Sequence, residues 1–178
     1  MTKPIRYIFV DTETTSLKSW EGEIVEFSIG TEIGRSFKIM TRKVQPEKLH
    51  LADPRSLEIN QYNEKDWKEA VSQKVAAGLM AMEIEKADVW IGHNPDFDIR
   101  FCRVLLKEHY PKVKFPKLVV DTRSLAVAAL AREGIKSSAM SVIRNFLGWS
   151  NEGAHTAEFD MKQCRRLFHM CMSMSLKN

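Results

Sequence analysis

IRYIFVDTET, residues 5–14, is the stretch from which the fold of this chain can be worked out. Residues 5–10 form a short apolar and β-branched run, which is typical of a strand buried on both faces of a central sheet. Because side chains alternate along a strand, Asp11 and Glu13 point to one face and Thr12 to the other. Two neighbouring carboxylates repel one another unless a cation neutralises them, so this strand end indicates a metal site. A simple turn or helix cap is the alternative interpretation of the motif taken alone.

The composition is that of one soluble domain spanning residues 1–178. The chain has 44% hydrophobic and 28% charged residues, which argues against a disordered or a membrane protein. Its N-terminus lacks the apolar region of a signal peptide, and its three cysteines contain no Cys-x-x-Cys pair, so neither secretion nor a zinc site is indicated. We therefore expect a cytoplasmic protein that does not bind a membrane.

The charge balance gives a weaker indication of the partner. Lys and Arg outnumber Asp and Glu by 27 to 23, for a net charge of +4 and a pI near 9.0. Such a balance favours approach to a polyanion such as nucleic acid. The basic residues are spread along the chain without forming a block, so an ordinary solvated surface explains them equally well.

Strands and helices follow one another in an order typical of an α/β protein. Further strands are expected at residues 23–30, 35–41, 88–92 and 118–120. Helices are expected at 66–86, 138–147 and 157–172. Two more are expected to begin after a turn at 93–96 and at Asp121. Residues 42–63 are expected to form a loop with one helical turn at 55–59. Strands first and then strands alternating with helices indicate a central mixed five-stranded sheet flanked by helices.

Helical periodicity in residues 66–86 predicts which side chains of that segment face the sheet. The apolar residues that recur at near-helical spacing are Trp67, Val71, Val75, Leu79, Met82 and Ile84. Packing is the common use of such a pattern, so we expect this stripe to cover the sheet.

A second acidic segment, GHNPDFDIRF, lies at the start of an expected helix. Asp96 stands four residues before Arg100, which suits a solvent-facing ion pair. Asp98 lies beside a buried face formed by Phe97, Phe101, Val104 and Leu105. Its carboxylate should therefore be desolvated and in need of a partner, which a cation would supply.

A third segment, GAHTAEFD, contains His155 and Asp160. We expect the helix to begin between them, so that Asp160 projects from its first turn and His155 lies on a loop from which it can reach a reacting water. Taken alone, the segment is better explained as a loop histidine beside a surface helix. Asp121 and Thr122 are most simply explained as caps of the helix that follows them.

Together, DTETTSL, HNPDFD and HTAEFD resemble the three exonuclease motifs of the DEDD superfamily, and the form H-x-x-x-x-D resembles its DEDDh, or DnaQ-like, branch. The resemblance covers almost the whole chain, and each motif falls in the expected context of strand end, helix start, or loop and helix. It implies an RNase H-like fold and a 3′–5′ exonuclease that releases nucleoside monophosphates from DNA or RNA.

The resemblance also implies roles for individual residues. It makes Asp11, Glu13, Asp98 and Asp160 the ligands of two Mg²⁺ or Mn²⁺ ions, and His155 the general base. It places Thr14, Thr15, Ser16 and Leu17 in the pocket for the terminal nucleotide. Ser16 stands where family members commonly have glycine, so the resemblance does not define the contacts to the terminal sugar. The expected partner is a single-stranded 3′ end, with a polymerase or a second copy of the chain as further candidates.

A protein of another class remains as the alternative. The same fold could serve as a catalytically silent module that binds nucleic acid or docks onto a polymerase. The presence of all four acids favours the hydrolase.

Overall fold

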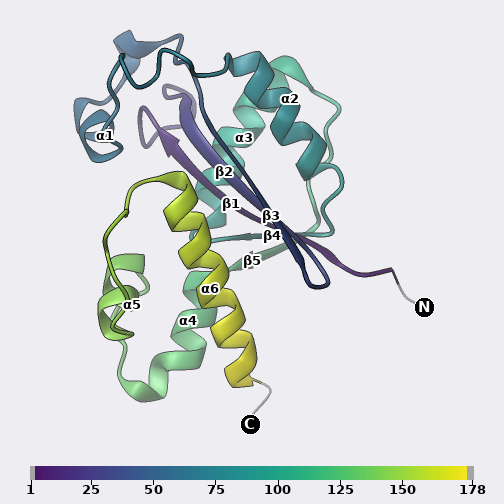
Figure 1. The fold of residues 1–178 in the computed structure, drawn as a ribbon, viewed down its shortest axis with the longest axis vertical. Helices are drawn as coiled ribbons and strands as arrows, with labels where there is room; N and C mark the ends of the chain where they lie inside the picture. The colour runs from purple at the N-terminus through teal and green to yellow at the C-terminus, as the bar shows by residue number, and fades with distance from the viewer. Residues whose placement is uncertain (1–2, 176–178) are drawn as a thin grey trace.

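The computed structural model describes residues 3–175, whose strands form one five-stranded sheet in the order β3-β2-β1-β4-β5 (Figure 1). Antiparallel pairing joins β1 (Arg6–Thr14), β2 (Ile24–Ile33) and β3 (Ser36–Lys43). Parallel pairing joins β1 to β4 (Val89–Gly92) and β4 to β5 (Leu118–Asp121). The predicted mixed five-stranded sheet is therefore confirmed.

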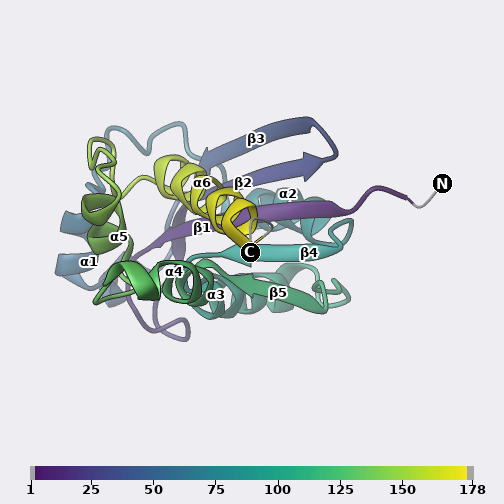
Figure 2. The ribbon, with the colours of Figure 1, turned by 90° about the horizontal axis from the view of Figure 1, so that it is seen from below.

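Helices cover both faces of the sheet (Figure 2). Their bounds are α1 (Pro54–Ile59), α2 (Gln73–Ile84), α3 (Pro95–His109), α4 (Thr122–Leu130), α5 (Met140–Phe146) and α6 (Ala157–Ser175), with 3₁₀ turns at Leu49–Leu51 and Ala131–Glu133. On one face α2 and α3 pack against the strands, whereas α6 crosses the other face with α4 beside it. Across residues 3–175, no helix combines the length and the apolar character needed to span a membrane.

Alternation along β1 divides the core into two layers. Ile8 and Val10 are buried in the layer formed with α2 and α3, whereas Phe9 is buried in the layer formed with α6. Asp11 follows Phe9 by two residues and therefore points toward α6, while Thr12 points toward α3. The polar end of β1 thus continues the two faces set by its apolar part.

A glycine lets α6 lie close to the sheet. A Cβ atom on Gly30 of β2 would be 2.6 Å from the sulfur of Met161 and 2.8 Å from the ring of Phe37. Contacts this short are not tolerated in a packed core. The absence of a side chain at this position therefore allows α6, which carries Asp160 in its first turn, to approach the strands closely.

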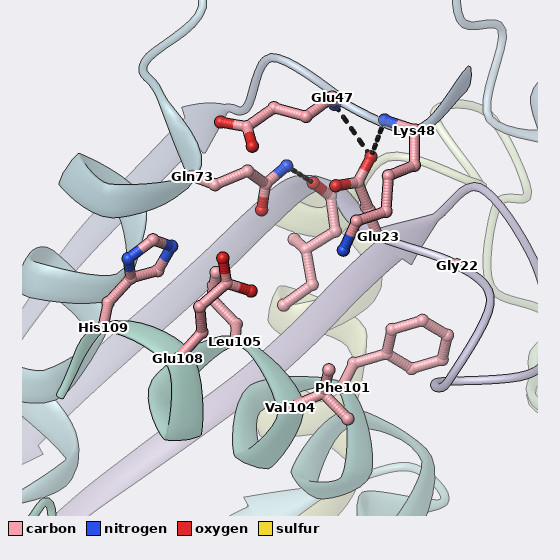
Figure 3. A pocket seen from close by; sticks show the side chains of 11 residues that line it. Gly22, Glu23, Glu47, Lys48, Gln73, Phe101, Val104, Leu105, Glu108 and His109 are labelled. Atoms are coloured by element: carbon pink, nitrogen blue, oxygen red, sulfur yellow. Dashed lines mark hydrogen bonds between the residues drawn. The ribbon is translucent and has the colours of Figure 1, made fainter. Parts of the chain in front are cut away.

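Hydrogen bonds connect the loop after β1 to the segment that follows β3 (Figure 3). The carboxylate of Glu23 accepts hydrogen bonds from the backbone N–H groups of Glu47 and Lys48 at 2.8 and 2.6 Å. Gln73 donates from Nε2 to the carbonyl oxygen of Ile24 at 3.1 Å. These bonds satisfy buried polar groups and fix the loop that leaves the end of β1.

The sequence-based prediction of α2 was wrong in its start and in its buried face. The helix begins at Gln73, after the N-cap Ser72, and Val71 instead forms a parallel bridge with Val44. Val75 and Met82, predicted to face the sheet, are each 50% exposed. The side chains that are buried from this helix are Gln73, Ala76, Ala77, Met80, Ala81 and Ile84. Small alanine side chains allow close approach to the sheet, which the spacing of larger residues concealed.

Two smaller differences concern the motifs. β1 continues to Thr14, so Asp11 and Glu13 lie within the paired strand rather than after it. On α3, Phe101 and Leu105 are buried as predicted, but Val104 is 43% exposed. The buried face of α3 instead includes Ile99, Cys102 and Leu106, so it is rotated from the predicted one.

Candidate functional site

Three carboxylates converge at the end of β1. Asp11, Glu13 and Asp160 each offer an oxygen atom within 4.8 Å of the others. Asp11 and Glu13 come from the face of β1 that looks toward α6, and Asp160 comes from the first turn of α6. The cluster therefore depends on strand alternation, which aligns the first two acids, and on the packing of α6, which adds the third.

Asp98 approaches the cluster from the other side of β1. It lies in the first turn of α3, is 4% exposed, and accepts a 2.8 Å hydrogen bond from the hydroxyl of Thr12. Asp98 is not among the three acids whose oxygens converge. Its charge nevertheless raises the pKa of both Asp11 and Glu13, so it belongs electrostatically to the same site.

Asp11, Glu13 and Asp98 have pKa values above those of ordinary carboxyl groups. Burial, followed by the charges of Asp98, Glu13 and Asp160, raises the pKa of Asp11 well above its usual range. Burial and neighbouring acids raise the pKa of Glu13 from 4.5 to about 7. Burial also raises the pKa of Asp98 from 3.8 to about 7, against the opposing effect of the Thr12 donors. Without a bound cation, the site thus holds more negative charge than its own residues neutralise.

These pKa shifts predict that the metal-free protein loses stability as the pH rises. Folding raises the pKa of Glu13 from 4.5 and of Asp98 from 3.8, in both cases to about 7, so the folded state holds protons that the unfolded state has released between these values. Stability therefore falls as pH rises through this window and levels off above it. We expect the melting temperature in EDTA to be about 10 °C lower at about pH 8 than at about pH 5.

Thermal unfolding of the wild type and of Glu13→Gln measures this effect. The variant cannot ionise at position 13 and should lose less stability over the same pH range. Saturating Mn²⁺ should restore the wild type at about pH 8. A metal-free melting temperature that stays constant or rises between the two pH values would contradict the proposed charge imbalance.

His155 lies beside the cluster in an unusual backbone conformation. Its φ of 65° is in the left-handed region, and its backbone N–H donates to Oδ2 of Asp160 at 2.9 Å. The exposed side chain lines a cavity of ≈ 230 Å³. The residues around this cavity are Asp11, His93, Met140, Ser141, Arg144, His155 and Asp160. The structure therefore brings the predicted histidine and two of the predicted acids to one cavity.

Two polar residues of the site were missed from the sequence. Arg144 of α5 donates from Nη1 to Oδ1 of Asp160 at 2.8 Å. Glu26 lies opposite Glu13 in the strand pairing and is 8% exposed, and burial raises its pKa. A charged residue inside an apolar run, as in EIVEFSIG and AMSVIRNFL, was the available signal. Such a residue indicates burial with a partner but not which partner.

The segment after β1 holds the residues predicted to contact the terminal nucleotide. Thr14, Thr15 and Ser16 are buried. The hydroxyl of Thr14 donates to the carbonyl oxygen of Ser16 at 2.7 Å, and the hydroxyl of Thr15 accepts from the N–H of Glu23 at 2.9 Å. Leu17, by contrast, is 74% exposed. Leu17 is therefore the member of this segment whose side chain is presented to solvent.

The serine at position 16 is accommodated by a glycine opposite it. A Cβ atom on Gly22 would lie 2.8 Å from the Cβ of Ser16, too short for two side chains to coexist. Ser16 also accepts a 3.2 Å hydrogen bond from the N–H of Lys18. The loop thus holds a serine without a clash.

Asp121 and His93 have structural contacts next to the site. Asp121 caps α4 by accepting the N–H of Arg123 at 2.9 Å, as predicted. Thr122 is not a side-chain cap: its buried hydroxyl donates to the carbonyl oxygen of Gly92 at 3.2 Å and lies 2.9 Å from Nδ1 of His93. Thr122 therefore fixes the orientation of His93 at the wall of the cavity.

Solved structures of known exonucleases share the fold of this chain. Escherichia coli exonuclease I in complex with a dT13 oligonucleotide superposes with a TM-score of 0.78 at 16% identity, over 94% of this chain and 40% of that chain. A product-bound exonuclease I gives 0.81 at 14% identity, over 98% and 45%. Cell-death related nuclease 4 gives 0.74 at 13% identity, over 96% and 65%. The predicted RNase H-like exonuclease fold is confirmed, and the chain spans less than half the length of exonuclease I.

The family is established by sequence. Residues 8–168 match the model of the RNase T family, which is described as exonuclease. The match begins in β1 and ends in α6, so it includes the three converging acids, Asp98 and the histidine loop. This chain belongs to the RNase T family of exonucleases.

Proposed function

We propose that this chain is a DEDDh-type 3′–5′ exonuclease that hydrolyses single-stranded DNA or RNA to nucleoside monophosphates with the help of two Mg²⁺ or Mn²⁺ ions. The observation that carries the proposal is the convergence of Asp11, Glu13 and Asp160, with the buried Asp98 near enough to raise the pKa of Asp11 and Glu13. Relatives of the same fold include an exonuclease solved with a single-stranded oligonucleotide, which supports this substrate class.

The side chains of the cluster fit a divalent cation. Carboxylate oxygens are the ligands that Mg²⁺ and Mn²⁺ prefer. Among the described residues, Asp160 is the only one of the three converging acids that forms a salt bridge, and its partner is Arg144. Burial, followed by the charges of the neighbouring acids, raises the pKa of Asp11 and Glu13, and a bound cation would oppose both effects. When bound, two such ions activate the attacking water and stabilise the leaving oxygen.

His155 is proposed to accept the proton of the attacking water. Its imidazole lines the cavity that Asp11 and Asp160 also line. The hydrogen bond from its backbone N–H to Asp160 fixes the loop but does not involve the imidazole. The ring can therefore take up a proton while the backbone stays anchored, as a general base requires.

Leu17 is proposed to contact the base of the terminal nucleotide. It is exposed on a loop whose neighbouring residues are buried and internally hydrogen-bonded. An apolar side chain on a fixed loop can stack against or wedge beside any base, because every base has a π-face. Thr14, Thr15 and Ser16 are then proposed to shape the pocket mainly through the loop backbone.

Degradation of end-labelled strands tests the proposed function. Single-stranded DNA and RNA of matched sequence, labelled at the 3′ or the 5′ end, are incubated with wild type in Mg²⁺, with wild type in EDTA, and with Asp11→Asn in Mg²⁺. Stepwise shortening from the 3′ end, lost in EDTA and in the variant, is the expected result. The strand that is shortened faster, DNA or RNA, identifies the preferred sugar.

Two other outcomes would refute the proposal. Shortening from the 5′ end would contradict the direction of cleavage. Strands that bind but keep their length, with Mg²⁺ and with Mn²⁺, would instead favour the catalytically silent module. In that case Asp11→Asn should bind the strands as well as the wild type does.

A further inference from the structure

Arg144 occupies a position that the proposed reaction does not explain. It lies on α5, and its side chain is 4% exposed. Its Nη1 donates to Oδ1 of Asp160 at 2.8 Å, and its guanidinium lies 5.4 Å from the ring centre of Phe159. Burial of a guanidinium is costly unless it is paired, so the bond to Asp160 is the reason that it can lie here.

The same arginine lines the cavity of the acidic cluster. Arg144, Asp11, His155 and Asp160 all border this cavity. Both oxygens of Asp160 are engaged within the protein, Oδ1 by Arg144 and Oδ2 by the backbone N–H of His155. Nε of Arg144 is buried and has no hydrogen-bond partner among residues 3–175. Arg144 therefore acts on the cluster through one carboxylate and is not fully satisfied by it.

The charge of Arg144 opposes the negative charges of the acidic cluster. Asp11, Glu13 and Asp160 converge, and Asp98 adds a fourth acid. A buried guanidinium beside them lowers their mutual repulsion when no metal is bound. A divalent cation at the same cluster would be repelled by that guanidinium, because both are positive and the buried guanidinium is poorly screened by solvent.

We propose that Arg144 is the counter-cation of the metal-free site and that a divalent ion binds in competition with it. Arg144 then sets the metal concentration at which the site fills. This inference rests on the proposed metal-dependent function and adds a regulating residue to it. It makes Arg144 a positioning residue, which acts on the metal through Asp160.

A purely structural salt bridge is the rival explanation, and the chain offers a matched example of one. Arg165 of α6 donates from Nε to Glu32 of β2 at 2.6 Å, and the side chain of Glu32 is 9% exposed. This pair also links two elements through a buried carboxylate. It lies outside the group of converging acids, so its loss should not depend on metal.

Calorimetric titration with Mn²⁺ distinguishes the two explanations. The proteins are wild type, Arg144→Met, Arg144→Lys and Arg165→Met, each freed of metal with EDTA and dialysed. Arg144→Met should bind Mn²⁺ about tenfold more tightly than the wild type, within the usual range of coupling between two sites. Arg144→Lys keeps the positive charge and should remain close to the wild type, and Arg165→Met should not change.

Thermal unfolding gives a second readout that does not depend on activity. In EDTA, Arg144→Met should melt about 5 °C or more below the wild type, because the acids lose their counter-charge. Saturating Mn²⁺ should remove most of this difference. Arg165→Met should lose the same amount in EDTA and in Mn²⁺.

The outcomes separate this inference from the proposed function. The inference, but not the proposed function, would be overturned if Arg144→Met bound Mn²⁺ no more tightly than the wild type. It would also be overturned if the melting temperature of this variant fell by the same amount with and without Mn²⁺. Failure of Arg144→Met to fold in either condition would do the same, whereas folding only with Mn²⁺ would support it. A wild type that binds no Mn²⁺, or binds it no better than Asp11→Asn does, would overturn the metal-dependent function itself.

Discussion

Asp98→Asn is expected to slow the release of 3′-terminal nucleotides by about a thousandfold or more, which is the scale on which metal-assisted hydrolysis depends on its acids. The amide cannot supply the negative charge that Asp98 contributes behind Asp11. Asparagine keeps an oxygen that can accept the 2.8 Å hydrogen bond from Thr12, so the local structure should remain intact. The initial rate of shortening of a 5′-labelled strand in saturating Mg²⁺ measures the loss.

Asp96→Asn is the matched control for this variant. Asp96 lies in the same first turn of α3, but its side chain is 74% exposed and its contact with Arg100 is a 3.5 Å surface ion pair, as the sequence predicted. Its replacement should leave the rate close to that of the wild type, because exposed pairs contribute little. Equal rates for the two variants would contradict a role for Asp98.

The stability of Asp98→Asn should change in the opposite direction to its activity. Burial raises the pKa of Asp98 to about 7, so at about pH 8 the metal-free wild type holds a charged carboxylate that burial disfavours. The asparagine variant has no such charge and should melt at the same or a higher temperature in EDTA. Loss of activity in a protein that is not destabilised would exclude unfolding as the cause.

His155→Asn is expected to lower kcat by about 10²–10⁴-fold, the usual contribution of a positioned general base. Asparagine adopts the left-handed backbone conformation more readily than most residues, so the φ of 65° and the N–H bond to Asp160 should survive. The proposed metal ligands are unchanged, and Mn²⁺ should bind as it does to the wild type. Single-turnover rates at saturating Mn²⁺ isolate the chemical step from metal binding.

A second histidine variant tests whether the loss is specific to the imidazole at position 155. His109→Asn is the control, because His109 lies at the end of α3 and does not line the cavity of the acidic cluster. It should keep a rate close to that of the wild type. A rate loss below about fivefold for His155→Asn would rule out general-base catalysis by this residue.

The sequence alone determined those features that arise from local alternation and capping. The apolar run before Asp11 predicted β1, and the two-residue period of a strand placed Asp11 and Glu13 on one face. The surface pair of Asp96 with Arg100 and the cap formed by Asp121 also followed from spacing within one element. Such features depend on neighbours in the chain, and so they can be read from it.

The residues that meet at the end of β1 come from segments that are distant in the sequence. Arg144 reaches Asp160 from a different helix, and Glu26 faces Glu13 across a strand pairing whose register the sequence does not state. The exposed face of α2 was also misjudged, because periodicity identifies an apolar stripe but not how closely a helix lies to its sheet. The sequence of this protein therefore determines its acids and their faces, whereas packing between distant segments determines how their charges are balanced.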